Sequence, residues 1–205
     1  MKIVVFGSTG LTGKQLVRQG LGLGHTVTAF ARTPEKLGLA HERLRIAQGD
    51  VFDFRAVSAT IKGQEGVLVA LGGKPVGPQP CAPGTLNIVL GMHEHAVRRL
   101  IVLSALGVGD SQGEAGRLFT HFVAPTVLRA EMADKTRQER VVQTSKLDWV
   151  IARPAYLTNG GKTRTYRAAL HLPHPSRISR ANVAAFMLAQ LTGEAWLRQA
   201  VALSD

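Results

Sequence analysis

Glycines spaced three residues apart occupy the turn that follows the first apolar segment of the chain. The segment Lys2 to Phe6 has the composition of a buried strand, and it runs directly into Gly7, Ser8, Thr9, Gly10, Leu11, Thr12 and Gly13. Glycines at this spacing let a strand turn sharply into a helix and let the backbone approach a phosphate, which the helix N-terminus then attracts. The pattern predicts a dinucleotide-binding turn; the alternative is an ordinary strand–helix turn without a ligand.

The end of the second expected strand, residues 26–31, indicates which dinucleotide this turn would hold. An NAD site usually places an acid there to bind the ribose 2′-hydroxyl, whereas this chain has Arg32. Arg32, Thr33 and Lys36 offer a guanidinium, a hydroxyl and an ammonium group to a 2′-phosphate. These residues favour NADP(H) over NAD(H), although Glu35 would weaken the preference. The alternative is that Arg32 and Lys36 are solvated surface charges.

Composition limits the classes of protein to consider. The 205 residues, of which 45% are hydrophobic, suffice for one domain over residues 1–205 with a large core. Apolar runs end well short of a membrane span, and the first strand leaves no room for a signal peptide, so we expect a cytoplasmic protein without a membrane partner. The sole cysteine, Cys81, has no partner for a disulfide and no neighbours at metal-ligand spacing.

The net charge of +11 raises the question of nucleic acid binding. Lys and Arg are scattered along the chain, there is no basic tail, and aromatic residues make up only 5% of the sequence. Stacking platforms and basic stripes of nucleic acid-binding proteins are therefore missing from the pattern, and no nucleic acid partner is expected. The positive field would instead attract an anionic cofactor or substrate.

Strand-like and helix-like segments alternate along most of the sequence, which predicts an α/β protein: a three-layer Rossmann fold with a mostly parallel twisted sheet flanked by helices. The expected strands after the first two are residues 44–48, 67–71, 100–103, 149–152 and an edge strand at 200–204. The expected helices are the one with Leu11, Val17 and Leu21 on its apolar face, 53–62, 85–96, one within 128–144, and one from the cap Ser179 through Leu191.

Three segments poor in regular pattern follow expected strand ends: residues 72–84, 107–117 and 157–175. Ligands of open parallel sheets bind beyond the carboxyl ends of the strands, so we expect these loops to form a substrate pocket. Asp50 and Val51, after the third strand, are placed to meet an adenine ring. Alternatively, Asp50 caps the helix that begins near Asp53.

The glycine turn, Arg32, Gly49-Asp50-Val51, Leu71-Gly72, Ser104-Ala105 and residues 147–154 together resemble the NAD(P)H-binding (NmrA-like) group of atypical short-chain dehydrogenases/reductases. The length, the order of elements and the step Ile178-Ser179 are most similar to its biliverdin-IXβ reductase/flavin reductase members. The resemblance implies hydride transfer from NADPH to a conjugated acceptor such as a flavin, biliverdin or a quinone. The further cofactor-binding positions that it implies are Ala70, Leu71, Gly72, Ser104, Pro154, Ala155 and Tyr156.

The catalytic pair Tyr-x-x-x-Lys of short-chain dehydrogenases is incomplete, because Glu131 stands at the tyrosine position while Lys135 is retained. The phenol that protonates a ketone is thus missing. Flavin reduction tolerates this loss, since it depends on stacking the hydride donor near the flavin N5 atom and takes its proton from solvent. Lys135 would bind the nicotinamide ribose or, alternatively, form an exposed pair with Glu139.

Two further candidates lie at strand ends. Ser104 is expected to donate a hydrogen bond near the reacting centre, or else merely to close the strand. Tyr156 would stack on the acceptor or donate a proton, or else pack under a loop. No metal ligand is assigned, because His121, His171 and His174 lack metal spacing.

The sequence therefore predicts an NADPH-dependent reductase that works as a monomer or weak homodimer. A non-catalytic NAD(P)-sensing regulator of the NmrA type is the alternative, because the missing tyrosine suits it equally well. An epimerase or dehydratase fits less well, since those reactions rely on the complete Tyr-Lys pair.

Overall fold

A mostly parallel eight-stranded sheet organises the computed structural model, which describes residues 1–73, 77–111, 129–163 and 165–205. The strand order is β3-β2-β1-β4-β5-β6-β10-β8, and every neighbouring pair is parallel except β10 with β8. The strands are β1 (Lys2–Phe6), β2 (Thr26–Ala31), β3 (Leu44–Gln48), β4 (Gly66–Val69), β5 (Arg99–Leu103), β6 (Asp148–Pro154), β8 (Arg167–Ala169) and β10 (Gln199–Ser204). A separate parallel pair joins β7 (Tyr156–Thr158) to β9 (Arg177–Ser179).

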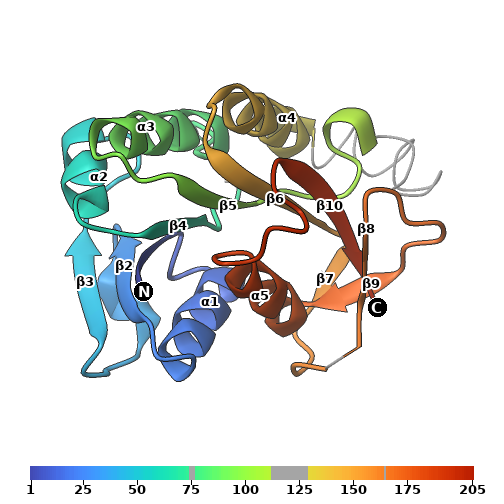
Figure 1. Cartoon of the computed structure of the whole chain (residues 1–205), viewed down its shortest axis with the longest axis horizontal. Helices are drawn as coiled ribbons and strands as arrows, with labels where there is room; N and C mark the ends of the chain where they lie inside the picture. The colour runs from blue at the N-terminus through green and yellow to red at the C-terminus, as the bar shows by residue number, and fades with distance from the viewer. Residues whose placement is uncertain (74–76, 112–128, 164) are drawn as a thin grey trace.

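Helices cover both faces of this sheet, as Figure 1 shows. The helices α1 and α5 lie on one face, and α2, α3 and α4 lie on the other. Their bounds are α1 (Leu11–Gly22), α2 (Phe54–Ile61), α3 (Cys81–Glu94), α4 (Arg129–Thr144) and α5 (Arg180–Ala189). The predicted three-layer Rossmann fold is thus confirmed. Short 3₁₀ turns add η1 (Pro34–Leu37) and η2 (Gly109–Ser111).

Alternation along the central strands builds one apolar core on each side of the sheet. Ile3 and Val5 of β1 pack with α1 and α5, whereas Val4 and Phe6 of the same strand pack with the opposite cluster around α2 and α3. Successive side chains of a strand point to opposite faces, so a strand buried on both faces must be apolar throughout. This explains why the short, uninterrupted apolar runs of the sequence located the central strands.

The last strand departs from the prediction. β10 is not an edge strand, because it lies between β6 and β8. The edge strand β8 falls within the predicted irregular segment 157–175, which also contains the last two residues of β7. Both strands have only three residues, too few for a period-two pattern to be recognised. Their pairing depends on backbone groups supplied by distant parts of the chain.

Helix ends also differ from expectation in informative ways. α3 begins at Cys81, earlier than the predicted residue 85, because the Asp134 carboxylate accepts hydrogen bonds from the Cys81 and Ala82 nitrogens at 2.7 and 3.2 Å. A side chain of α4 thus caps α3. Val17 and Leu21 are buried as predicted, but Leu11 is 61% exposed, so it does not belong to the buried face of α1.

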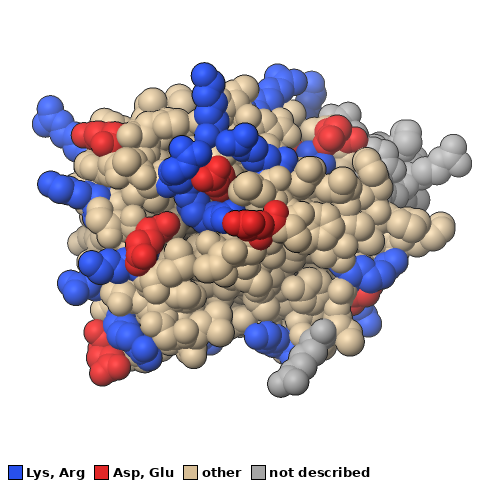
Figure 2. All heavy atoms as spheres, in the orientation of Figure 1, with Lys and Arg blue, Asp and Glu red and all other residues tan. Residues whose placement is uncertain are grey.

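Within the described part of the chain, no helix has the length and apolar character needed to cross a bilayer. On the face drawn in Figure 2, Lys and Arg side chains are spread over the surface with Asp and Glu among them. The view agrees with the scattered charge of the sequence, because the basic side chains on this face do not form one unbroken patch.

Candidate active site

The glycine turn joins β1 to α1 in the conformation that its sequence predicts. Gly7 has a φ of +79°, and a Cβ there would collide with the Ala70 carbonyl oxygen of the neighbouring chain segment. A Cβ at Gly13 would collide with the Gly7 carbonyl oxygen. Both positions therefore require glycine, one for the backbone conformation and the close approach, the other for packing.

The N-terminus of α1 is open, unlike the starts of the neighbouring helices. Asp53 accepts hydrogen bonds from the Arg55 and Ala56 nitrogens at the start of α2, and Ser179 accepts one from Asn182 at the start of α5. The N-cap of α1 is Gly10, which provides no side-chain hydrogen bond, and no acid lies in the first turn. The terminal N–H groups of α1 are thus left for an anionic ligand.

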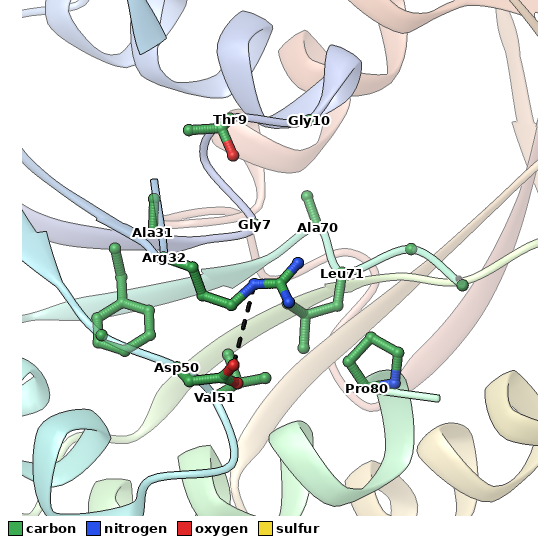
Figure 3. Close-up of a pocket in the computed structure, with 14 residues that line it drawn as sticks. Gly7, Thr9, Gly10, Ala31, Arg32, Asp50, Val51, Ala70, Leu71 and Pro80 are labelled. Atoms are coloured by element: carbon green, nitrogen blue, oxygen red, sulfur yellow. Dashed lines mark ion pairs between the residues drawn. The ribbon is translucent and has the colours of Figure 1, made fainter. Parts of the chain in front are cut away.

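A first cavity of about 200 Å³ lies beside this turn, at the carboxyl ends of β1 to β4 (Figure 3). Its position matches the crevice in which open parallel sheets bind ligands. The predicted residues that line it are Gly7, Thr9, Gly10, Arg32, Asp50, Val51, Ala70, Leu71 and Gly72. The lining is completed by Gly49 of the motif Gly49-Asp50-Val51, by Gly73 and Pro80 of the predicted pocket segment 72–84, and by Phe30 and Ala31, which the sequence did not indicate.

The predicted cofactor residues that line neither this cavity nor the one that adjoins it are Ser8, Gly13, Thr33 and Lys36. Ser8 is fully buried, and its hydroxyl donates to the Phe30 carbonyl oxygen at 2.9 Å, which ties the turn to β2. Thr33 and Lys36 are exposed outside the lining, at the start of η1. Of the three residues predicted to bind the 2′-phosphate, only Arg32 therefore lines the cavity.

Arg32 and Asp50 face each other across the cavity, as Figure 3 shows. The Arg32 Nε and Asp50 Oδ2 atoms are 3.9 Å apart, and the two side chains are 58% and 40% exposed. Asp50 also accepts a hydrogen bond from the Phe52 nitrogen at 3.1 Å. The alternative that Asp50 caps α2 is wrong, because Asp53 is the cap. The Asp50 carboxylate instead competes with any 2′-phosphate for Arg32.

A second cavity of about 830 Å³ adjoins the first and shares Gly10 and residues 70–73 with it. This volume lies in the range of small-molecule sites. The predicted residues in its lining are Leu11, Thr12, Ser104, Lys135, Pro154, Ala155 and Tyr156. Leu157 and Pro175 belong to a predicted pocket loop, and the lining residues that the sequence did not assign to a pocket are Leu103, Ala105, Leu106, Glu131, Ser176 and Arg180.

The predicted pocket loops contribute unequally to this second cavity. Gly72 and Gly73 come from segment 72–84, and Leu157 and Pro175 come from segment 157–175. The described part of segment 107–117, residues 107–111, does not line the cavity. The remainder of that segment lies outside the described residues.

Ser104 brings a buried hydroxyl without a partner to the cavity. Its side chain is 3% exposed, and its nitrogen donates to the Ala152 carbonyl oxygen at 2.8 Å. The Oγ atom has no hydrogen-bond partner in the described part of the chain. The alternative that Ser104 merely closes the strand explains its backbone hydrogen bond but not its hydroxyl. A buried hydroxyl that is left without a hydrogen-bond partner costs about 1–3 kcal/mol. A ligand in this cavity would satisfy it.

Lys135 is buried rather than exposed. It is 5% exposed, and its Nζ atom donates to the carbonyl oxygens of Leu71 and Leu103 at 3.4 and 3.3 Å. The alternative of an exposed Lys135–Glu139 pair is wrong, because Glu139 binds Arg153 through distances of 3.0 and 2.6 Å. The ammonium group is thus held against the ends of β4 and β5, at the wall of the cavity.

Glu131 and Tyr156 lie on other parts of the wall. The Glu131 Oε1 atom accepts a hydrogen bond of 3.4 Å from the Gly73 nitrogen, which ties α4 to the loop after β4. Tyr156 is 76% exposed and therefore is not packed under a loop. Its ring remains available to an acceptor in the cavity.

Buried polar side chains of α4 hold this half of the site together. Asp134 caps α3, and Gln138 donates to the Thr85 hydroxyl at 3.0 Å. Burial opposes the charge on Arg153, but hydrogen bonds and charges of Glu139 and Asp110 raise its pKa above the ordinary value. The sequence did not predict this network, because a polar helix face usually indicates that the face is exposed to solvent.

Cys81 and the described histidines do not form a nucleophilic or metal site. Burial raises the pKa of the Cys81 thiol to about 11, so the thiol is protonated at neutral pH and is a poor nucleophile. Among the described residues, no group of three or more His, Cys, Asp or Glu side chains is arranged to hold a metal ion. His121 lies outside those residues.

The sequence profile of the family described as NAD(P)H-binding matches residues 7–194, which include both cavities. The chain belongs to this NAD(P)H-binding family. A curated relative, an uncharacterised chloroplastic protein of Arabidopsis thaliana, is 28% identical over 174 residues, which cover 79% of this chain and 61% of that protein. The match spans only 35% of the length of three further curated relatives, among them cinnamoyl-CoA reductase 2 of Medicago truncatula, which is 28% identical over 117 residues.

Solved structures agree with this membership of the NAD(P)H-binding family at the level of fold. ChuY, an anaerobilin reductase from Escherichia coli O157:H7, matches with a TM-score of 0.86 and 23% identity, over 100% of this chain and 97% of that one. A short-chain dehydrogenase/reductase from Veillonella parvula, solved with NADP, matches with a TM-score of 0.86 and 17% identity, over 100% and 94%.

Proposed function

We propose that this protein is an NADPH-dependent reductase that transfers a hydride to a conjugated acceptor such as a flavin, biliverdin or a quinone. The observation that carries the proposal is the unpartnered hydroxyl of Ser104, in a large cavity continuous with the dinucleotide cleft. The nicotinamide half of the dinucleotide would extend from the first cavity into this second one, and the acceptor would bind beside it there. The reductase named among the solved neighbours is consistent with the proposal.

The residues of the first cavity account for cofactor binding. The open N-terminus of α1 and the turn around Gly10 would hold the pyrophosphate, because unpaired N–H groups and the helix dipole favour an anion. Arg32 would bind the 2′-phosphate in competition with Asp50. Bound NADPH would supply a hydride, which carries two electrons, and be left as NADP⁺.

The residues of the second cavity would orient the reacting groups. The Ser104 hydroxyl would donate a hydrogen bond to the nicotinamide end or the acceptor, and Lys135 would bind the ribose beside it. Leu106, Leu157 and the Tyr156 ring offer an apolar wall to a planar acceptor. Solvent would supply the proton that completes reduction, since Tyr156 is open to water.

A dinucleotide-sensing regulator of the NmrA type is the second candidate. The observation in its favour is Glu131, which places a carboxylate where the short-chain dehydrogenases have their proton-donating tyrosine. Such a protein would bind NADP(H) without turnover. A cytoplasmic location and a monomeric or weakly dimeric state remain predictions for either candidate.

An acceptor panel separates the two candidates. NADPH is mixed with the protein and with FMN, riboflavin, biliverdin or a quinone, and oxidation is followed by the nicotinamide absorbance. We expect acceptor-dependent oxidation with at least one member of the panel. Calorimetry on the same preparation measures NADP(H) binding, so binding without any oxidation would favour the sensor and overturn the reductase.

A further inference from the structure

We infer that the acceptor of the second cavity carries an acidic group, a carboxylate or a phosphate, which Arg180 binds. The inference rests on the proposed reductase function and narrows its substrate class. Arg180 is the first residue of α5, and it lines the cavity together with Tyr156, Leu157, Pro175 and Ser176. These residues form the part of the wall farthest along the chain from the glycine turn.

Neutral groups hold the Arg180 guanidinium in place. Its Nη1 atom donates to the Asn159 Oδ1 atom at 2.8 Å and to the Leu157 carbonyl oxygen at 3.4 Å. No carboxylate among the described residues lies within ion-pair distance of Arg180. Among the described residues, the hydrogen bonds of the guanidinium involve Nη1 alone, which leaves the N–H groups on Nε and Nη2 open to a ligand.

Arg32, which lines the first cavity, and Arg153, which binds α4, both have acidic partners. Arg153 is paired with Glu139 and Asp110, and Arg32 is paired with Asp50. Arg180 is half-buried and lacks such a partner. A cation withdrawn from water without an opposite charge is costly, and a planar guanidinium matches the two oxygens of a carboxylate or phosphate. An oxyanion on the ligand would offset this cost.

The surroundings point to Arg180 rather than to the helix end as the anion-binding group. The Ser179 hydroxyl already caps α5 by accepting from the Asn182 nitrogen at 3.0 Å. Elsewhere in the cavity lining, the charges of Glu131 and Lys135 offset each other, which leaves Arg180 as the unbalanced charge. The apolar wall and this single cation together fit a flat hydrophobic molecule with an acidic substituent.

Pairs of acceptors that differ only in the acidic group test the inference. FMN is compared with riboflavin, and biliverdin with its dimethyl ester, in binding titrations to protein saturated with NADP⁺. We expect the acidic member of at least one pair to bind about tenfold more tightly than its neutral counterpart. A preference for FMN over riboflavin would identify phosphate as the group that Arg180 binds. A preference for biliverdin over its dimethyl ester would identify carboxylate.

Substitutions at one position assign the effect to Arg180. Arg180→Gln is expected to abolish the preference while leaving the affinity for the neutral member unchanged, and Arg180→Lys, which keeps the charge but not the planar group, is expected to retain about a threefold preference. Arg18→Gln is the matched control, because Arg18 is an exposed arginine of α1 outside both cavities. This control should keep the full preference.

Any of five results would overturn the inference. Equal affinities within both pairs, or a preference that survives Arg180→Gln, would show that Arg180 does not bind the acceptor. Weaker binding of NADP⁺ alone to Arg180→Gln would assign Arg180 to the cofactor instead. Turnover of neutral and acidic acceptors at equal rates would support the reductase function but contradict the anion-binding role of Arg180. If no acceptor bound, both hypotheses would be contradicted.

Discussion

The two cavities of this protein are built in different ways. The first is lined by residues between Gly7 and Pro80, which follow directly on the ends of four neighbouring parallel strands. The second draws its lining from residues 10 to 180 and depends on α4. Short-range sequence patterns therefore determine the dinucleotide cleft, whereas long-range polar contacts determine the adjoining cavity.

Buried polar groups make the second cavity sensitive to single changes. The described buried residues of α4 are Asp134, Lys135, Gln138, Glu139 and Val142, of which only the last is apolar. Each polar group is held by a partner on α3, on β6 or at a strand end. Removing one partner leaves the other buried without compensation, which costs more than the loss of an exposed contact.

The largest expected effect comes from Glu139→Gln. This change leaves Arg153 with only the exposed Asp110 as a charged partner, so we expect the free energy of unfolding to fall by about 3 kcal/mol. Chemical denaturation measures the loss. Asp148→Asn is the control, because the arginines that pair with Asp148, Arg98 and Arg198, are mostly exposed, and such pairs contribute about 0–1 kcal/mol each. Equal losses in the two variants would contradict the contrast between buried and exposed pairs.

Arg32→Gln tests the first cavity. We expect NADPH to bind with a free energy about 2 kcal/mol less favourable, because a charge-assisted contact to the 2′-phosphate is lost. The affinity for NADH, which lacks this phosphate, should remain unchanged. Calorimetry measures both.

Lys36→Gln is the comparison variant for Arg32, since Lys36 lies outside the lining of the cavity. We expect a smaller loss of NADPH affinity than for Arg32→Gln. An equal loss would show that the 2′-phosphate site extends over η1, as the sequence predicted.

Ser104→Ala separates function from stability in the second cavity. The hydroxyl is buried and has no partner within the described residues, so its removal from the ligand-free protein should not lower the free energy of unfolding and should raise it by about 1 kcal/mol. We expect kcat/KM for NADPH oxidation to fall about tenfold, which corresponds to about 1.4 kcal/mol. Stopped-flow absorbance and denaturation measure the two quantities.

Ser145→Ala is the matched control for Ser104. Ser145 is also buried, but its hydroxyl donates to the Val142 carbonyl oxygen at 2.6 Å and accepts from the Leu147 nitrogen at 3.3 Å. We expect a loss of about 1 kcal/mol in stability and no change in kcat/KM. If Ser145→Ala lowered kcat/KM and Ser104→Ala did not, the functional hydroxyl would not be that of Ser104.

The smallest expected effect is that of Asp50→Asn. Removing the carboxylate frees Arg32 and reduces repulsion of the 2′-phosphate, so NADPH should bind about threefold more tightly. Calorimetry with NADPH and NADH checks the direction for each cofactor. A weaker affinity for NADPH would mean that the contact of Asp50 with the cofactor outweighs its competition for Arg32.

Much of the fold and of the first cavity follows from local sequence. Apolar runs of four to six residues identify β1, β4 and β5, because strands covered on both faces leave no polar positions. Gly7 and Gly13 identify the turn, since their backbone neighbours leave no room for a Cβ. These signals are read within about ten residues, where sequence and conformation are directly linked.

The second cavity could be predicted only as a set of loops and single residues. The sequence suggested Ser104, Lys135 and Tyr156, but not that Lys135 is buried, nor that Arg180 lines the same wall. A polar helix such as α4 carries the same pattern whether it faces water or buried partners. Its Asp134, Gln138 and Glu139 acquire their roles only from residues on other elements.

The sequence by itself thus determined a Rossmann sheet and a glycine turn able to hold a dinucleotide, because strand burial and tight turns impose residue types at fixed short spacing. The tertiary structure alone decided that Asp50 meets Arg32, that α4 buries its charges, and that Arg180 stands without a counter-charge in the second cavity. These features depend on distances between segments far apart in the chain, which no local pattern encodes.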